Sequence, residues 1–257
     1  MRRRAKWLLL LAPFILLGLA HADRDPDSVD NWRQASRAPV GLAPDPAVTR
    51  EPVVQVYAAR AVRWRGYFGV HTWVAAKRAN AAAFTIYEVT GFDVRRGGRA
   101  VRVSQRPADG RWFGSAPDLL ADVRGAGVEA LIAGIERAVA EYPYQDSYRI
   151  WPGPNSNTFT AFVLRRVPEL RADLPAHAIG KDYLGSSLVA RSPSGTGVQA
   201  SLLGAIGVLA GVEEGLELNV LGLTFGIDPN DLGLKLPLVG RVGFGGPVTA
   251  STLTGTP

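Results

Sequence analysis

Alternation of apolar and polar residues predicts β-strands in the first part of the chain, beginning with residues 53–59. Residues 67–76 alternate most clearly, and residues 84–94 form a third β-rich run. Gly97-Gly98 separates that run from a fourth, residues 100–105. Two adjacent glycines favour a two-residue hairpin turn, because both turn positions need a positive φ. We therefore expect antiparallel pairing of the last two strands.

Helical patterns follow the predicted strands. Residues 115–118, with Ser first and Asp last, are typical of a helix N-terminus, so we expect helix to begin there. Apolar residues over 128–139 recur at spacings of three and four, which predicts an amphipathic helix. A further helix is predicted to begin at Asn155 or Ser156 and to end before Pro168.

The pattern changes again in the last third of the chain. Residues 201–212 and 216–227 are apolar and Gly-rich, and we interpret them as two strands of a long hairpin buried against the core. The alternative is a re-entrant or membrane-surface segment, since each run is too short to span a bilayer. Residues 246–257 are expected to form a disordered tail. Together these patterns predict an α+β fold in one domain over residues 53–245. The domain is expected to have a mainly antiparallel sheet with packed helices.

The N-terminal segment has the features of an export signal. Residues 1–6 carry four cations, residues 7–20 are apolar, and Ala20-His21-Ala22 matches a small-x-small cleavage pattern. We expect residues 1–22 to be a signal peptide, with a retained inner-membrane anchor as the alternative. Both place the rest of the chain in the periplasm or cell envelope. Residues 23–52 hold five prolines and predict an extended linker or a wrapping arm.

Charge and composition exclude several classes of function. The 257-residue chain has a formal net charge of +6, but four of its 29 cations precede the first apolar run, so no nucleic-acid partner is implied. The chain has no cysteine and three histidines, which excludes thiolate chemistry, disulfides and Cys- or His-rich metal sites. We expect neither a metal nor a cofactor.

The segment from Trp151 to Phe159 carries the most informative polar cluster. Asn155, Ser156 and Asn157 gather at a predicted helix start, where backbone N–H groups lack partners. One interpretation is helix capping. The other is a nucleophile whose developing anion is stabilised by the helix dipole and nearby N–H groups. Trp151 stands directly before the cluster and is a candidate wall of a binding site.

Three segments resemble an uncharacterised bacterial family, domain of unknown function 3750 (DUF3750). They are Gly69–Trp73, Gly153–Phe159 and Ala178–Leu184. Circularly permuted papain-like proteins of the NlpC and lecithin retinol acyltransferase types have a His-bearing strand, a following strand with a polar residue, helices, and then N-C-x-x-F at a helix start. The order of the predicted elements here, with Asn155–Phe159 at the helix start, is similar. Ser156 stands where those proteins have their cysteine.

The papain-like resemblance implies a permuted papain-like fold and three catalytic candidates. Ser156 would be the nucleophile, His71 the base, and Glu88, on the next strand, the group that orients the base. Trp73, beside His71, joins Trp151, Asn155 and Asn157 as a candidate binding residue.

Two functions of different class follow. The first is a non-catalytic binding or scaffolding module for an envelope ligand, with a membrane surface as a further candidate partner. The second is a Ser-His dependent amide or ester hydrolase or acyltransferase acting on an envelope component. The missing cysteine favours the first, whereas His71 and the hydroxyl of Ser156 keep the second open.

Overall fold

A computed structural model describes residues 33–230, 232–244, 248 and 250–254, together with Gly18. The predicted signal segment, apart from Gly18, and residues 19–32 lie outside the described residues. The export signal therefore stays a prediction. Among the described residues, no helix combines the length and the apolar character needed to cross a bilayer.

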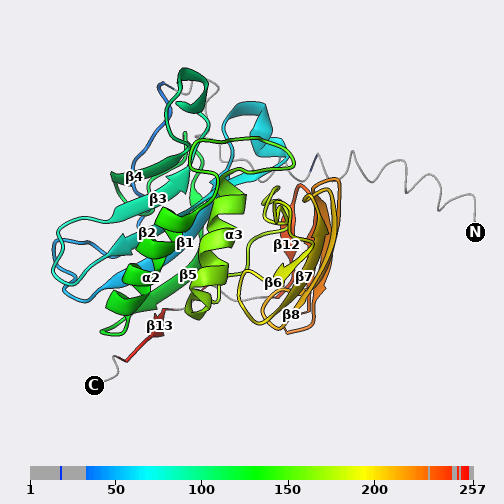
Figure 1. Ribbon diagram of the computed structural model, residues 1–257. Helices are drawn as coiled ribbons and strands as arrows, with labels where there is room; N and C mark the ends of the chain where they lie inside the picture. The colour runs from blue at the N-terminus through cyan, green and yellow to red at the C-terminus, as the bar shows by residue number, and fades with distance from the viewer. Residues whose placement is uncertain (1–17, 19–32, 231, 245–247, 249, 255–257) are drawn as a thin grey trace, which may run out of the picture.

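The first sheet has six strands in the order β13-β5-β1-β2-β3-β4 (Figure 1). All neighbours are antiparallel except β13, which runs parallel to β5. The strands are β1 (Val53–Arg60), β2 (Val70–Lys77), β3 (Thr85–Val89), β4 (Val101–Gln105), β5 (Pro117–Arg124) and β13 (Ser251–Thr252). Short 3-10 helices are η1 (Arg63–Tyr67), η2 (Val94–Arg96) and η3 (Pro168–Leu170).

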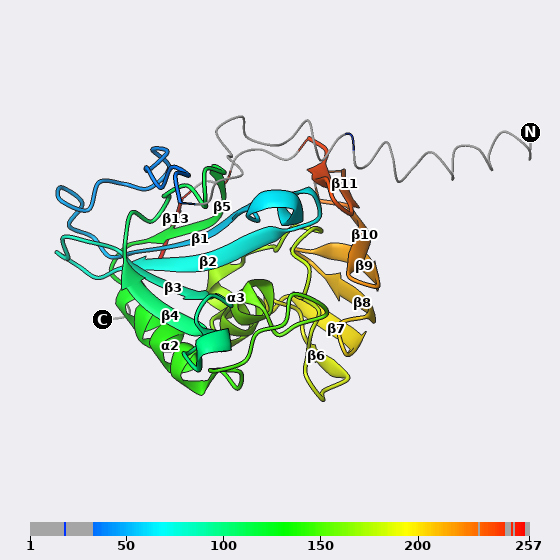
Figure 2. The ribbon, with the colours of Figure 1, turned by 90° about the horizontal axis from the view of Figure 1, so that it is seen from above.

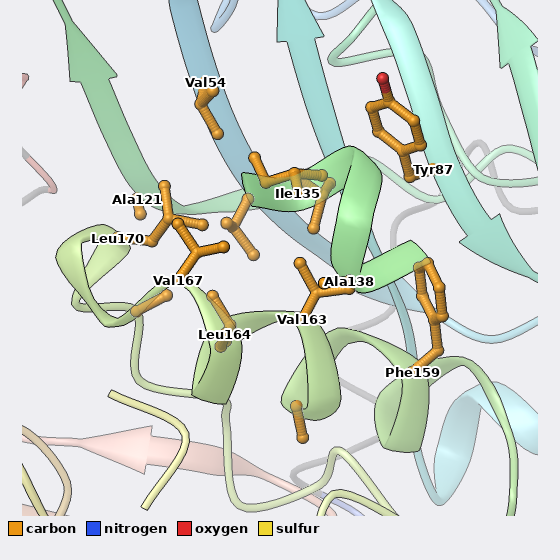
Figure 3. Packing of buried hydrophobic residues seen from close by; sticks show 14 of the residues in the cluster. Val54, Tyr87, Ala121, Ile135, Ala138, Phe159, Val163, Leu164, Val167 and Leu170 are labelled. Atoms are coloured by element: carbon orange, nitrogen blue, oxygen red, sulfur yellow. The ribbon is translucent and has the colours of Figure 1, made fainter. Parts of the chain in front are cut away.

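Both faces of the two central strands are covered, and every residue of β1 and β2 is buried. Helices α2 (Val128–Glu141) and α3 (Ser156–Arg166) cover one face with the apolar side chains shown in Figure 3. Aromatic and small residues from the regions around 35–43 and 108–113 cover the other face. Burial on both sides explains the nearly continuous apolar sequence of β1.

The second sheet has seven strands, each antiparallel to the next in the chain (Figure 2). They are β6 (Val189–Arg191), β7 (Gly197–Leu202), β8 (Ile206–Gly211), β9 (Gly215–Val220), β10 (Leu223–Asp228), β11 (Gly233–Leu236) and β12 (Gly240–Val242). Helix α3 lies between the two sheets (Figure 1). It contacts the first through Thr72 and the second through an Arg165–Gln199 hydrogen bond of 2.6 Å.

The α+β class and the mainly antiparallel pairing predicted from the sequence are confirmed. The helices expected over 128–139 and from Ser156 are present, and they end at Glu141 and Arg166. The prediction of a helix beginning at residue 115 is wrong. Residues 117–124 form β5, which pairs with β1 on the side that β2 leaves open.

Two turn predictions need correction. Strands β3 and β4 pair as expected, but residues 90–100, including η2, connect them instead of a two-residue turn. The apolar run 201–212 contains the end of β7, a turn and β8, and the run 216–227 contains most of β9 and β10. Apart from Leu209, which is buried, the apolar side chains of these strands point outward and are not buried against the core.

Both ends of the domain pack against the first sheet. Asp109 Oδ2 accepts hydrogen bonds from the backbone N–H groups of Val40, Leu42 and Ala43 at 3.2, 2.7 and 3.2 Å, so this part of the linker is a wrapping arm. The predicted C-terminal tail contributes β13, and Leu253 packs against the core. Pairing with β5 therefore places Ser251 and Thr252 on the sheet, although the tail to which they belong is predicted to be disordered from its composition.

Candidate functional site

Helix α3 begins at Ser156 because the preceding residue satisfies its exposed backbone donors. Asn155 Oδ1 accepts hydrogen bonds from the N–H groups of Asn157 and Thr158 at 2.9 and 3.2 Å. Thr158 Oγ1 accepts from the Asn155 N–H at 3.1 Å, which completes a capping box. Ser156 is the first helical residue, and its hydroxyl makes no hydrogen bond within the described part of the chain. The cap is therefore Asn155, and the Ser156 hydroxyl is not used for it.

The predicted binding residues Asn155 and Asn157 hold the fold together instead of facing a ligand. Asn155 Nδ2 donates to the carbonyl of Ile179 at 2.9 Å. Asn157 Nδ2 donates to the carbonyls of Val70 and Ile179 at 3.1 and 2.8 Å, and its Oδ1 accepts from Thr72 Oγ1 at 3.0 Å. Both side chains are buried. They fix the start of α3 against β2 and against the loop that leads to the second sheet.

His71 on β2 and Glu88 on β3 form a buried pair. His71 Nε2 lies 2.9 Å from Glu88 Oε2, and Arg106 Nη2 donates to the same oxygen at 3.3 Å. The indole of Trp112 stacks on the imidazole, with ring centroids 3.6 Å apart and planes 8° from parallel. These contacts fix the position and orientation of the imidazole.

Electrostatics define the protonation state of this pair. Burial lowers the pKa of His71, and the nearby Arg106 lowers it further, against the raising effect of Glu88. Burial raises the pKa of Glu88, but the hydrogen bond from His71, together with the charge and the hydrogen bond of Arg106, outweighs burial and brings the pKa below its ordinary value. A carboxylate at Glu88 requires a proton on His71 Nε2. The neutral imidazole then has an unprotonated Nδ1, which makes no hydrogen bond with a described residue.

Trp73, expected to contact a ligand, is fully buried. Its indole stacks on Tyr57 and His71 with centroid distances of 5.5 and 5.8 Å, and its Nε1–H donates to the carbonyl of Ala108 at 2.8 Å. It lies behind His71 and supports the imidazole.

A cavity of about 720 Å³ opens where β3 diverges from β2. The two strands pair only over Val74–Ala76, so backbone pairing with β3 does not continue along the first residues of β2. The chain after β3 and the loop before α3 form the remaining walls. The lining residues are Ala61, Val62, Arg65, Val70, His71, Thr90, Gly91, Phe92, Val94, Arg95, Trp112, Tyr148, Ile150, Trp151 and Ser156.

Ser156 and His71 both line this cavity, but they do not face each other as the papain-like resemblance implies. Thr72 contacts the start of α3, with its Oγ1 3.3 Å from the Ser156 carbonyl oxygen. Because side chains alternate along a strand, His71 points to the opposite face of the sheet, toward Trp73 and Trp112. No hydrogen bond joins the Ser156 hydroxyl to His71. A molecule in the gap beside β2 could contact both.

Two buried polar atoms on the cavity wall have no hydrogen-bond partner, Arg65 Nε and Thr90 Oγ1. Arg95, also on the wall, is exposed, and neither arginine forms an ion pair with a described residue. No acidic residue is among the described residues that line the cavity. With His71 neutral, the cavity therefore carries a net positive charge and unused hydrogen-bond donors.

Sequence reasoning placed Ser156, His71 and Trp151 on this cavity but missed most of its wall. Arg65, Thr90 and Tyr148 come from connecting segments with no recognisable motif. Arg95 belongs to an arginine-rich region whose other members are mostly paired; Arg102, for example, binds Asp93. Among the described residues, no three acidic or histidine side chains are grouped so as to hold a metal ion.

The family model described as "Protein of unknown function (DUF3750)" matches residues 51–183, more than half of the chain. The chain belongs to the DUF3750 family. The DUF3750 match contains the first sheet from β1 to β5, both helices and every residue that lines the cavity, whereas the second sheet lies beyond it. Searches of curated proteins and of solved structures gave no significant match. The papain-like resemblance stays a prediction.

Proposed function

We propose that this protein is a non-catalytic binding module of the cell envelope, and that its cavity takes a small anionic molecule with an apolar part. The observation that carries the proposal is the pair of cavity arginines, Arg65 and Arg95, without an acidic neighbour on the wall. An anionic group would form ion pairs with the guanidinium groups of Arg65 and Arg95.

The size and the remaining wall of the cavity fit such a ligand. A volume of about 720 Å³ lies within the usual range of roughly 300–1,000 Å³ for small-molecule sites. Phe92, Trp112 and Trp151 supply flat apolar surface, while His71 and Ser156 supply single polar groups. The envelope location rests on the charged N-terminus and the apolar run 7–20.

Octyl phosphate is a suitable probe, because it combines an anionic head with an apolar chain. We expect it to bind the full-length chain and to change the fluorescence of the cavity tryptophans, whereas octanol binds more weakly. Arg65→Gln should weaken binding about tenfold or more, since a hydrogen bond to a charged group is lost. Arg63→Gln is the matched control, because Arg63 is exposed and lies off the cavity wall. Equal binding of octanol and octyl phosphate, or no effect of Arg65→Gln, would contradict the proposal.

A second candidate is hydrolysis or acyl transfer at Ser156, and two observations favour it. The Ser156 hydroxyl lies at a helix N-terminus and is not used as the cap. His71 Nδ1 is unprotonated and its ring is held by Glu88. Ser156 Oγ would bond to a substrate carbonyl carbon while its proton passes through a water molecule in the cavity to His71, and then from His71 to the leaving group. Water or an acceptor alcohol would then cleave the acyl-enzyme.

A fluorophosphonate probe separates the two candidates. Covalent labelling of the native chain that disappears in Ser156→Ala, with Thr160→Ala as a buried hydroxyl control, would replace the binding module by the enzyme. The binding proposal expects no labelling above the level of Ser156→Ala.

A further inference from the structure

The second sheet has an apolar outer face and a polar inner face, the reverse of the usual arrangement. The outward positions of β7–β12 carry only apolar side chains. They are Val198, Ala200, Leu202, Ile206, Val208, Ala210, Leu216, Leu218, Val220, Leu223, Phe225, Ile227, Leu234, Leu236 and Val242. Most of these side chains are exposed, for example Val208 at 57%. Soluble monomers rarely expose an apolar surface of this extent.

The buried charged groups of the inner face are paired with one another, and this pairing fixes the register of the strands. Lys235 Nζ donates to Glu217 Oε1 at 2.7 Å and to Asp173 Oδ2 at 2.6 Å, and Lys181 binds the other oxygen of Glu217. Asn219 Nδ2 donates to Asp182 Oδ2 at 2.6 Å. A one-residue slip would move these charges to the outside and leave their partners buried and unpaired.

The outer face is hollowed. A cavity of about 600 Å³ is lined by outward side chains such as Val198, Leu218 and Phe225. Inner-face residues such as Glu217 and Lys235 also border the hollow, but outward apolar side chains form most of its surface, so it opens on the outer side. Two copies joined through such concave faces would leave a void between them, whereas flexible acyl chains can fill it.

The turns and edges of the sheet also fit a lipid surface. Leu203, Leu221 and Leu232 occupy turn positions with φ of 54°, 55° and 53°, and all three are exposed. Asn or Gly would adopt this conformation at lower cost in water, so leucine at the turn tips indicates an apolar surrounding. The edge strand β6 carries the exposed Arg191, which pairs in register with the outward Val198 and complements anionic headgroups.

Exposed tryptophan marks one end of the sheet. Trp151 is 49% exposed, and its Nε1–H donates to the carbonyl of Leu221 in the β9–β10 turn at 3.0 Å. Tryptophan is enriched at the interface between hydrocarbon and water. The outward positions contain no tyrosine, tryptophan or hydrogen-bonding group apart from Arg191, although protein interfaces are enriched in such residues.

We infer that the outer face of the seven-stranded sheet binds the acyl chains of a phospholipid monolayer and docks the protein on a membrane surface. The mouth of the first cavity would then lie near the headgroups, because Trp151 belongs both to the cavity wall and to the end of the sheet. Docking does not depend on the proposed ligand, so the two proposals fail separately.

The absence of native cysteine allows a site-specific test with the full-length chain. Val208→Cys and Val103→Cys are matched sites, since both valines lie on strands and are 57% exposed. Each is labelled with the polarity-sensitive fluorophore NBD and mixed with vesicles of equal parts phosphatidylcholine and phosphatidylglycerol. We expect a blue shift and a several-fold rise in emission at position 208, with no change at position 103.

Three outcomes would overturn the inference. If the NBD emission at position 208 changes with protein concentration in the absence of vesicles, the outer face binds a second copy of the chain. Vesicle binding with unchanged NBD at position 208 would assign it to another segment, such as residues 7–20. A Val208→Asn variant that partitions like Val103→Asn would show that the face is not used, because we expect about tenfold weaker partitioning for the former.

Discussion

The two sheets place opposite kinds of side chain against α3. The first sheet presents Val70 and Val74 to the helices, and Phe159 and Val163 of α3 complete an apolar core. The second sheet presents glutamine, glutamate, asparagine and lysine to the same helix and its following loop, and it turns its aliphatic residues outward. Buried and exposed residues alternate regularly along the strands of the second sheet, whereas both faces of the central strands of the first sheet are buried. Alternation therefore shows that a strand has two faces but does not show which one points inward.

Partners from outside the strands decide the orientation. Arg165 on α3 and the loop residues Asp173, Lys181 and Asp182 supply charges that only a polar sheet face can satisfy. Burial lowers the pKa of Lys181, but Glu217, Asp182 and Asp173 together raise it above its ordinary value. The charges thus compensate one another in a layer between α3 and the second sheet.

Removing the Glu217 carboxylate from the polar inner face should have the largest effect on stability. Glu217→Ala leaves Lys181 and Lys235 buried without their shared partner, so we expect the free energy of unfolding to fall by about 3–5 kcal/mol. Urea denaturation of the full-length chain measures the change. Glu213→Ala is the control, since that carboxylate pairs with the exposed Arg171 at 3.7 Å and its loss should cost less than about 1 kcal/mol. Equal effects of the two substitutions would mean that the inner face is not buried.

The contact between the sheets should respond to acid through His177. Its carbonyl accepts from the Val70 N–H at 3.2 Å, and its ring packs on Gly240. Burial, and then the nearby Arg60, lower the pKa of His177 to about 3. The unfolded chain, with a histidine pKa of about 6.5, binds the proton first, so stability is present above pH 6.5 and is lost as the pH falls.

Between pH 7 and pH 5 we expect native protein to lose roughly 1–2 kcal/mol more unfolding free energy than His177→Gln. Urea denaturation at both pH values gives the difference. Parallel pH profiles for the two proteins would contradict the burial of this imidazole.

The smallest expected difference in unfolding free energy is between substitutions of a buried and of an exposed isoleucine. Ile135 on α2 is fully buried in the first core, and Ile135→Val should cost about 0.5–1.5 kcal/mol. Ile206 on β8 is 55% exposed, and without lipid Ile206→Val should change the unfolding free energy by less than about 0.5 kcal/mol. Thermal or urea unfolding of both variants tests the difference, and a larger cost at Ile206 would place that residue in a protein core.

Local signals predicted the helices well, because their limits depend on nearby residues. Asn155 and Thr158 form the cap of α3, and Pro168 stands just beyond its end. Strand β5 was not predicted, because Ser115 and Asp118 have the spacing that is typical of a helix N-terminus. Its actual conformation depends on pairing with β1, which is far away in the sequence. Tertiary pairing here overrides the local pattern.

The candidate site was predictable to a similar degree. Ser156 and His71 reach one cavity, as the order of elements suggested, and Glu88 holds the imidazole. Their relation across β2 could not be predicted, because it depends on which face of the strand α3 covers. Trp73 and Asn157 were plausible ligand contacts only while their structural partners, such as Ala108 and Val70, were unknown.

Thiol accessibility on β8 tests the reversed polarity of the second sheet most directly. Val208 and Leu209 are neighbours, but Val208 is 57% exposed and Leu209 is 3% exposed. With no native cysteine, single variants Val208→Cys and Leu209→Cys can be labelled with maleimide under native conditions without lipid. The structure predicts labelling of Val208→Cys at the rate of a free thiol and protection of Leu209→Cys until the protein unfolds. Fast labelling at position 209 with protection at position 208 would contradict the orientation of the sheet and the membrane-docking inference built on it.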